Sequence, residues 1–504
     1  MEDRLVLVAT AVAYLAVVLA IGAWAARRTR SARDFFIAGQ GLGLLVTGLA
    51  TTSAAFSGFV FLGGPGLTYR LGAASFMICA STGFTAGLLC WVLAKRLRLL
   101  AEVREIYTVP DAVLARYRSR TASGLAAAAV LVGTVGYLGA QLLALGILLD
   151  GLFGFGQRFG AFGLPLAMAA GGAAILFYSV AGGMIAGVYT DLVQGALMVG
   201  VAVAVFARAW SVTGGLFDVA SALARDDRFG PDFLDPVAGA PLLTAFGFFF
   251  VFSIGTLGQP HMLHKFYMLR DPAKLKWLPL VIAVSQSLCL LIWVGVGLAV
   301  PALVVAGDMP ALADPDTATP AFVSLFTPGM LGGLVLAGVV AAVMSTADSF
   351  VNVGAAALVR DLPRAFGRRV SDELTWGRWT TAGLLVASGL FALVYGDLIA
   401  LLGTFAFGTF AAALVPALAV GLNWKRVPAA AAVASIGTGL GLNLVLEFLG
   451  RQTLVAWLPG SPLPPGALPT AVSLVASFTV LFAVTYLHKG DEPIDDDVAA
   501  VMEA

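Results

Sequence analysis

Long runs of apolar residues, separated by short polar segments, dominate this sequence. A membrane-spanning helix needs about 20 consecutive, mostly apolar residues to cross the hydrocarbon core of a bilayer. Thirteen stretches meet this requirement, at about residues 4–26, 41–68, 73–94, 122–149, 162–181, 186–209, 241–264, 278–304, 328–358, 379–396, 398–422, 427–449 and 468–487. The pattern therefore predicts an all-α polytopic membrane protein with about 13 transmembrane helices in the lipid bilayer.

The positions of the basic residues predict how the chain is oriented. Lys and Arg concentrate in cytoplasmic loops. If the N-terminus lies outside and the C-terminus lies in the cytoplasm, most of the 30 basic residues fall on the inner side of the membrane. Lys265 is one of them, and this orientation places it in a cytoplasmic loop. We expect a multi-pass protein of the bacterial inner (plasma) membrane, whose acidic tail from His488 onward is cytoplasmic and disordered.

Composition narrows the function. The chain is 59% hydrophobic and 12% charged, whereas soluble proteins carry about 25% charged residues. A net charge of +1 gives no sign of a nucleic-acid partner. The sequence contains no GxxxxGK[ST] phosphate loop, so we expect no ATP-driven step within this chain. No motif supports an enzyme, and a carrier driven by an ion gradient fits best.

The second predicted span contains a break. The run Thr51–Gly58 is small and polar in mid-membrane, and Gly63-Gly64-Pro65-Gly66 follows it. Broken helices are tolerated in membranes only where they line protein or a cavity, and they indicate a transporter's binding site. Unwinding here would free the carbonyls of Ser53 and Phe56 to face a cation. The alternative is that small residues simply allow close helix packing.

The ninth predicted span places Ala342, Ser345, Thr346 and Ser349 on one helix face, at i, i+3, i+4 and i+7. Adjacent hydroxyls and carbonyls form a set of hard oxygen ligands that suits a small cation. Alternatively, these hydroxyls bond back to their own helix.

Other polar residues lie within predicted spans. Asp191 is a candidate functional carboxylate, because carboxylates inside membranes are costly. It could equally cap a helix N-terminus, and the two roles are compatible. Tyr137 and Gln141 lie one turn apart and could line a cavity. We interpret His261, next to a predicted kink at Pro260, as an interface histidine near the cytoplasmic end.

Seven short motifs together resemble the sodium:solute symporter family, which includes the bacterial sodium/proline symporter and the sodium/glucose cotransporters. The likeness runs from about residue 38 to residue 426. The motifs are Phe36-Ile37-Ala38-Gly39-Gln40; Ser57-Gly58 through Pro65-Gly66; Tyr107-Thr108-Val109-Pro110-Asp111; Gly182-Gly183 with Thr190-Asp191 and Gln194-Gly195; Gly258-Gln259-Pro260-His261; Ala341 through Ser349; and Asn423-Trp424-Lys425-Arg426.

The resemblance implies a LeuT-type fold with two inverted five-helix repeats. The expected organisation is a first peripheral helix and loop (1–36), a core of ten helices (37–426, with repeats at about 37–209 and 241–426), two peripheral helices (427–487) and a tail (488–504).

The resemblance also implies functional residues. Sodium would be held by the carbonyls of Ser53, Phe56 and Ala342 and the hydroxyls of Ser345 and Thr346, and Asp191 would lie on the sodium exit path. The implied substrate-pocket residues are Ala55, Ser57, Tyr137, Gln141, Phe252 and Thr256. The proline symporter has Asp at the Ala55 position and Trp and Tyr at the Phe252 and Thr256 positions, while Ser57 and Tyr137 match it.

We therefore expect sodium-coupled symport of a small organic solute by alternating access. An amino acid such as proline or a short monocarboxylate suits the pocket, whereas the apolar residues around Ala55 disfavour a sugar. Two alternatives stay open: a proton-coupled symporter of the same fold, and a transport-like solute-sensing subunit.

Overall fold

In a computed structural model of the protein, the described part comprises residues 41–237, 242–449, 462–490 and 492–504, and isolated positions up to residue 24. The first predicted helix is described only at those isolated positions, and the motif at residues 36–40 lies outside the described residues. The regular secondary structure in the described ranges is helical, apart from one backbone bridge between Leu42 and Leu269.

The main helices are α3 (Leu44–Ala55), α4 (Gly64–Leu71), α5 (Thr82–Leu89), α6 (Lys95–Val103), α7 (Val109–Tyr117), α8 (Arg120–Phe153), α10 (Gly163–Thr213), α11 (Leu216–Arg225), α12 (Leu242–Gly255), α13 (Pro260–Phe266), α14 (Leu278–Cys289), α15 (Leu291–Ala306), α16 (Ala318–Phe326), α17 (Gly329–Ala356), α19 (Glu373–Tyr395), α20 (Ile399–Val415), α21 (Ala429–Leu449), α22 (Pro469–Leu487) and α23 (Asp496–Glu503). Shorter segments join them, among them η2 (Phe59–Gly63), η9 (Pro315–Thr317) and η10 (Ala357–Asp361).

The longest of these helices are apolar enough to cross a bilayer. Among the described residues, 9 helices meet the length and hydropathy requirement, or up to 11 if each of two bent pairs counts as one span. One of them, Phe155–Phe177, runs from the short α9 (Phe155–Phe159) into α10, and another, Gly187–Thr213, is the second part of α10. The predicted all-α polytopic class is confirmed, whereas the count of 13 is not established by the described residues.

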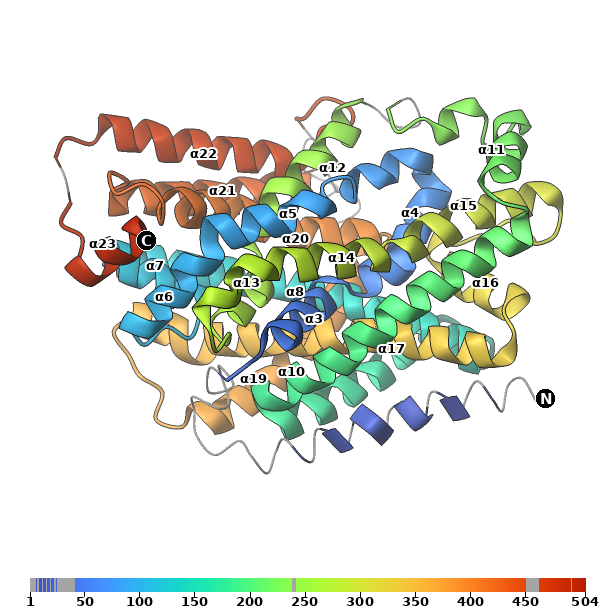
Figure 1. Cartoon of the computed structure of the whole chain (residues 1–504), viewed down its shortest axis with the longest axis horizontal. Coiled ribbons are helices and arrows are strands. Elements are labelled where there is room, and N and C mark those ends of the chain that lie inside the picture. Colours follow the sequence, from blue (N-terminus) through green and yellow to red (C-terminus); the bar gives the residue numbers. More distant parts are fainter. Residues whose placement is uncertain are drawn as a thin grey trace.

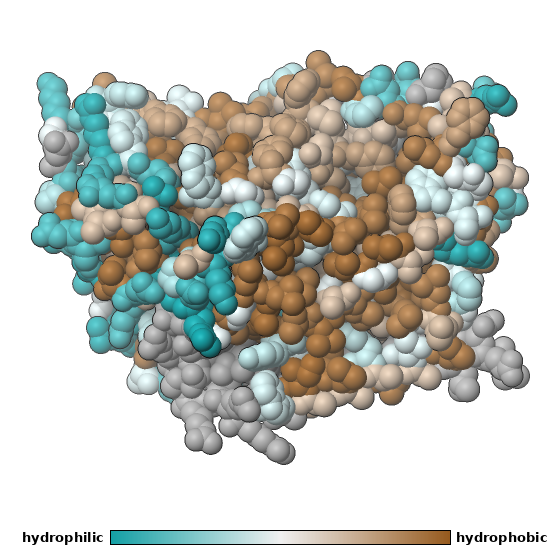
Figure 2. Space-filling view, in the orientation of Figure 1, coloured by the Kyte–Doolittle hydropathy of each residue, from teal (hydrophilic) through white to brown (hydrophobic). Residues whose placement is uncertain are grey.

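Most of the long helices run roughly along the long axis of the molecule (Figure 1). Hydrophobic side chains cover the middle of the molecule, and hydrophilic ones gather toward its ends (Figure 2). We call one end the basic end, after Arg98, Arg104, Arg116, Arg360 and Lys425. We call the other the acidic end, after Asp150, Asp314, Asp316 and Asp397.

Two bent pairs interrupt the bundle near its middle. The first joins α3 to the segment from Phe59 at 55°, and the second joins α12 to α13 at 43°. The first bend begins at Phe56, where the backbone is extended (φ −100°, ψ 111°), and the second has Pro260 at the start of α13. Proline fits the first turn of a helix because its missing N–H is not needed there. Both breaks predicted from the sequence are therefore present.

The C-terminal tail is folded, contrary to the expectation of disorder. Residues Asp496–Glu503 form α23, which packs against α6 at the basic end and buries Val498, Val501 and Met502. Arg104 forms ion pairs with Asp495 and Asp497, and Lys425 pairs with Glu503. The sequence prediction was wrong because it considered only the polar content of the tail and not the three apolar residues on one face of a short helix.

Candidate functional site

The first break is held open by side chains of α8. The Gly58 N–H donates to Gln141 Oε1 at 3.0 Å, so the side chain replaces the carbonyl that a continuous helix would supply. The Ser57 hydroxyl lies 3.4 Å from the Tyr137 hydroxyl, and Ser57 Oγ also accepts from the Phe59 N–H at 3.1 Å. Tyr137 and Gln141, predicted as cavity-lining residues, thus lie together, and Gln141 supports the break itself.

This support predicts the result of a substitution. Gln141→Leu keeps the size of the side chain but leaves the buried Gly58 N–H without its acceptor. An unsatisfied buried donor costs about 1–3 kcal/mol, so we expect a lower thermal unfolding midpoint and reduced solute uptake. Gln157→Leu, at an exposed position, is the matched control. Equal stability of the two variants would contradict this role of Gln141.

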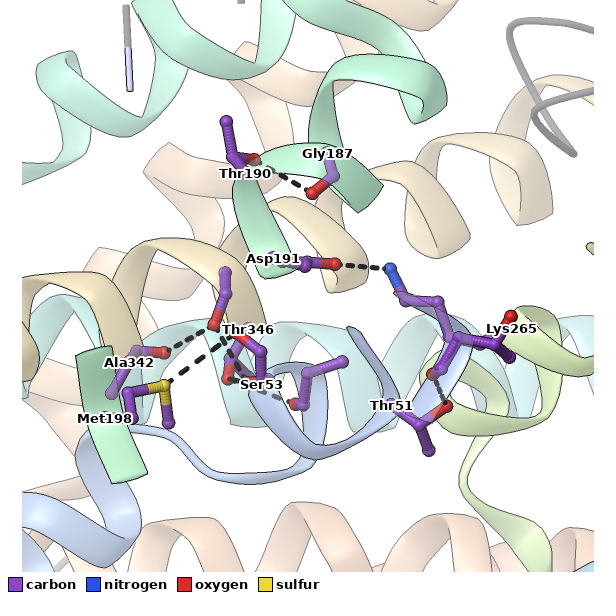
Figure 3. A network of polar contacts seen from close by, with 12 residues as sticks. Thr51, Ser53, Gly187, Thr190, Asp191, Met198, Lys265, Ala342 and Thr346 are labelled. Atoms are coloured by element: carbon purple, nitrogen blue, oxygen red, sulfur yellow. Dashed lines mark hydrogen bonds and ion pairs between the residues drawn. The ribbon is translucent and has the colours of Figure 1, made fainter. Parts of the chain in front are cut away.

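A cluster of buried oxygens joins the end of α3 to the middle of α17 (Figure 3). The Ser345 hydroxyl donates to the Ser53 carbonyl at 2.8 Å and to the Ala342 carbonyl at 3.2 Å. The Thr346 hydroxyl donates to the Ala54 carbonyl at 3.1 Å. Four of the five predicted sodium ligands therefore come together, and Phe56 lies at the break one residue beyond α3.

These donors fit a monovalent cation. The hydroxyl and carbonyl oxygens are buried and uncharged, whereas divalent calcium sites use carboxylates. A bound cation would accept lone pairs from Ser345 and Thr346 while their hydroxyl protons turn to other acceptors. The alternative of bonding within the same helix holds only for Ser345, which also bonds Ala342. The bonds to Ser53 and Ala54 cross between helices.

Asp191 lies deep in the bundle and has a basic partner. Its carboxylate lies 2.7 Å from the ammonium of Lys265 on α13, and both side chains are 2% exposed (Figure 3). The expectation that Lys265 belongs to a loop was wrong: α13 turns inward at the second break and carries Lys265 toward α10. The helix α10 continues through Asp191, so an N-cap role is also excluded.

A small cavity adjoins the breaks. Its volume is ≈ 70 Å³, compared with about 300 Å³ or more for pockets that hold drug-sized ligands. Of the six residues predicted for a substrate pocket, Ala55, Tyr137, Phe252 and Thr256 line this cavity. The other two are not among its lining residues: Ser57 contacts Tyr137, and Gln141 bonds to Gly58. The further lining residues include Phe59, His261, Gln286, Trp293 and Phe407. Every lining side chain is uncharged or a histidine.

The sequence interpretation missed His261. Its ring lies in the cavity wall, with its centroid 4.1 Å from that of Phe350 and 6.0 Å from that of Tyr137. Nδ1 of His261 is buried without a hydrogen-bond partner among the described residues. The Gln259-Pro260-His261 motif was the available signal, because broken helices form the binding sites of many transporters.

A second group of motif residues closes the basic end. Asp111 pairs with Arg360 at 3.2 Å and with Arg364 at 3.5 Å, and Thr108 donates to Asp361 at 3.0 Å. These contacts join the start of α7 to η10, which follows α17, and to Arg364 just beyond it. Arg116, also on α7, donates to four carbonyls between residues 421 and 427. The third and the seventh motifs therefore form structural contacts at this end, away from the cavity.

Comparisons with known proteins show the family of this chain. The family described as "Sodium:solute symporter family" matches residues 35–439. The osmoregulated proline transporter OpuE of Bacillus subtilis is 28% identical over 446 residues, covering 86% of this chain and 87% of that protein. The sodium/proline symporter of Escherichia coli is 28% identical, covering 89% of each. The sodium/pantothenate symporter of Escherichia coli is 26% identical, covering 88% and 92%.

Solved structures show the same fold at low sequence identity. A Na+-coupled sialic acid symporter in a substrate-bound, outward-open state aligns with a TM-score of 0.72 at 18% identity, over 97% of this chain and 99% of that one. MHP1, a nucleobase-cation-symport-1 family transporter, aligns with a TM-score of 0.56 at 14% identity, over 93% and 98%. The predicted LeuT-type fold is confirmed. With its broken helices, its fold and a family match over most of its length, this chain is a membrane transporter that belongs to the sodium:solute symporter family.

Proposed function

We propose that this protein is a secondary active transporter that couples the uptake of a small organic solute to sodium by alternating access. The observation that carries the proposal is the oxygen cluster of Ser53, Ala342, Ser345 and Thr346, with Phe56 completing the set, which bridges the broken α3 and α17. Sodium held there would fix α3 against α17. A ligand shifts such an equilibrium only by binding one state more tightly, and we assign the tighter binding to the outward-open state.

The cavity beside this cluster is the proposed solute site. Its wall contains the stacked aromatic rings of Phe252 and Phe407, with centroids 4.4 Å apart, and of Phe252 and Phe59, with centroids 5.6 Å apart. Tyr137 and His261 add polar groups to the same wall. An uncharged cavity next to a sodium ion suits a zwitterion or a singly charged anion, because the ion supplies a balancing charge. An amino acid or a short monocarboxylate satisfies this condition, and curated relatives transport proline and pantothenate.

The proposal includes orientation and organisation. We place the basic end in the cytoplasm, following the preference of Lys and Arg, and the acidic end outside. The two inverted repeats would be about 37–209 and 241–426, so that each repeat contributes one of the two broken helices. The residues from 427 to 487 would be peripheral. Asp191 would lie on the sodium path toward the basic end, beside its partner Lys265.

Uptake into liposomes tests the function. Purified protein would be reconstituted and given labelled proline, other amino acids, pantothenate and short monocarboxylates under an inward sodium gradient, a potassium gradient or a pH gradient. Sodium-driven accumulation of one solute is the expected result. Accumulation with a pH gradient alone would favour the proton-coupled alternative. Solute binding without uptake under any gradient would favour the sensor alternative.

A further inference from the structure

Asp316 is a buried carboxylate at the acidic end that the proposed transport site does not use. It lies in η9, within the loop between α15 and α16, and it is 2% exposed. One oxygen, Oδ2, accepts from the Ile399 N–H at 2.7 Å, at the first residue of α20. The other, Oδ1, is buried with no hydrogen-bond partner among the described residues.

The unpartnered oxygen faces the first broken helix. A Cβ added to Gly66 of α4 would lie 2.6 Å from Asp316 Oδ1, so the carboxylate is packed directly on the α4 backbone. Asp316 therefore lies between α4 and the start of α20. Two further contacts close the same region: Thr319 of α16 donates to the Phe61 carbonyl at 2.7 Å, and Arg70 of α4 lies 3.6 Å from Asp397.

The electrostatic surroundings disfavour a charged carboxylate here. Asp314 and Asp397 line the same cavity of ≈ 380 Å³, and Asp150 lines the adjacent one with Asp314. Arg70 is the basic residue of this group, is half-exposed and is already near Asp397. Burial, followed by repulsion from Asp314 and Asp397, raises the pKa of Asp316 to about 8, against the opposing effects of the Ile399 N–H and Arg70.

We propose that Asp316 is a proton-binding site of the gate at the acidic end: its carboxyl group takes up a proton from water when α4 and α20 close around it, and returns that proton to water when they separate. The neutral form leaves no buried unpaired charge, and Oδ2 still accepts from Ile399. Opening admits water to both oxygens, so the carboxylate can ionise. The proton is a ligand of the gate, separate from the sodium of the proposed transport cycle.

The direction of the pH effect follows from linkage. The proton binds more tightly in the closed form, so protonation stabilises closure. This stabilisation is complete below the ordinary aspartate pKa of 3.8 and is lost as the pH rises through about 8. Between these values one proton is linked to closure, so each pH unit changes the ratio of open to closed protein by about tenfold.

The first test counts protons in the wild-type protein, with Asp316→Asn as the comparison. Saturating sodium chloride is added to protein in weakly buffered detergent solution near pH 7, with a pH indicator, while tryptophan fluorescence or calorimetry reports sodium binding. The inference rests on the proposed function in two respects: sodium is used here to open the gate, and the second test places the acidic end outside. We expect release of up to one proton per protein in the wild type and in Asp314→Asn, and none in Asp316→Asn, which preserves the acceptor for Ile399 but cannot ionise.

The second test does not depend on sodium. In cells that express a variant whose other cysteines are replaced by serine, an impermeant thiol reagent reaches the cavity residue Cys79 only from outside. The rate of Cys79 labelling is measured in this variant and in the same variant with Asp316→Asn. The first rate divided by the second should rise by up to tenfold for each pH unit. Sodium binding without proton release, or a constant labelling ratio, overturns the proton site. If sodium does not bind but the labelling ratio rises with pH, the sodium proposal is overturned and the proton site at Asp316 is supported.

Discussion

Replacing Lys265 by methionine should lower the free energy of unfolding by about 3–5 kcal/mol, the range found when one partner of a buried ion pair is removed. The substitution leaves the Asp191 carboxylate buried between α10 and α13 without the ammonium that now lies 2.7 Å away. Because methionine fills a similar volume, the loss arises from the unpaired charge and not from a packing defect. Chemical denaturation of the purified protein in detergent, followed by its tryptophan fluorescence, measures the change.

A double-mutant cycle separates the charge from other effects. Lys265→Met combined with Asp191→Asn has no unpaired charge, so its stability should recover most of the loss, giving a coupling energy of several kcal/mol. Lys274→Met is the matched control, because Lys274 is exposed in the loop that follows α13. If the single and double Lys265 variants are equally unstable, the ion pair does not determine the stability of this contact.

The sequence predicted those features that depend on local pattern. The small polar run around Ser53 indicated the first helix break, and the spacing of Ala342, Ser345 and Thr346 placed three oxygens on one face of α17. Both follow from the geometry of a single helix. The contact between these two segments is a tertiary feature. It was anticipated from the family resemblance, and the structure brings Ser345 to within 2.8 Å of the Ser53 carbonyl.

The residues that the sequence did not reveal depend on how helices are arranged in space. The basic-residue rule assigns Lys265 to a loop because it considers distance along the chain and cannot recognise that α13 turns into the bundle. Asp316 belongs to an acidic loop segment, which predicts solvent exposure, yet α4 and α20 bury it. The packing of α23 also depends on a distant partner, Arg104, that no local pattern identifies.

Removing either hydroxyl of the proposed sodium cluster should raise the sodium concentration needed for half-maximal uptake by about 10- to 100-fold. This range corresponds to the loss of an oxygen contact to a charged group, about 1.5–3 kcal/mol. Ser345→Ala and Thr346→Ala remove oxygens that lie against the Ser53 and Ala54 carbonyls at the end of α3. Sodium-dependent uptake in liposomes, over a series of sodium concentrations at constant ionic strength, gives the value for each variant.

Two further variants distinguish sodium binding from helix packing. Thr346→Ser retains the hydroxyl and should require nearly the wild-type sodium concentration, whereas Thr346→Val retains the volume and should behave as Thr346→Ala does. Ser349→Ala is the control, because Ser349 lies one turn further along the same face of α17 and its hydroxyl has no hydrogen-bond partner among the described residues. Since solute and sodium sites are coupled reciprocally, the variants with weaker sodium binding should also bind solute less tightly at a fixed sodium concentration. An unchanged sodium requirement in Ser345→Ala, Thr346→Ala and Thr346→Val together would move the sodium site away from the junction of α3 and α17.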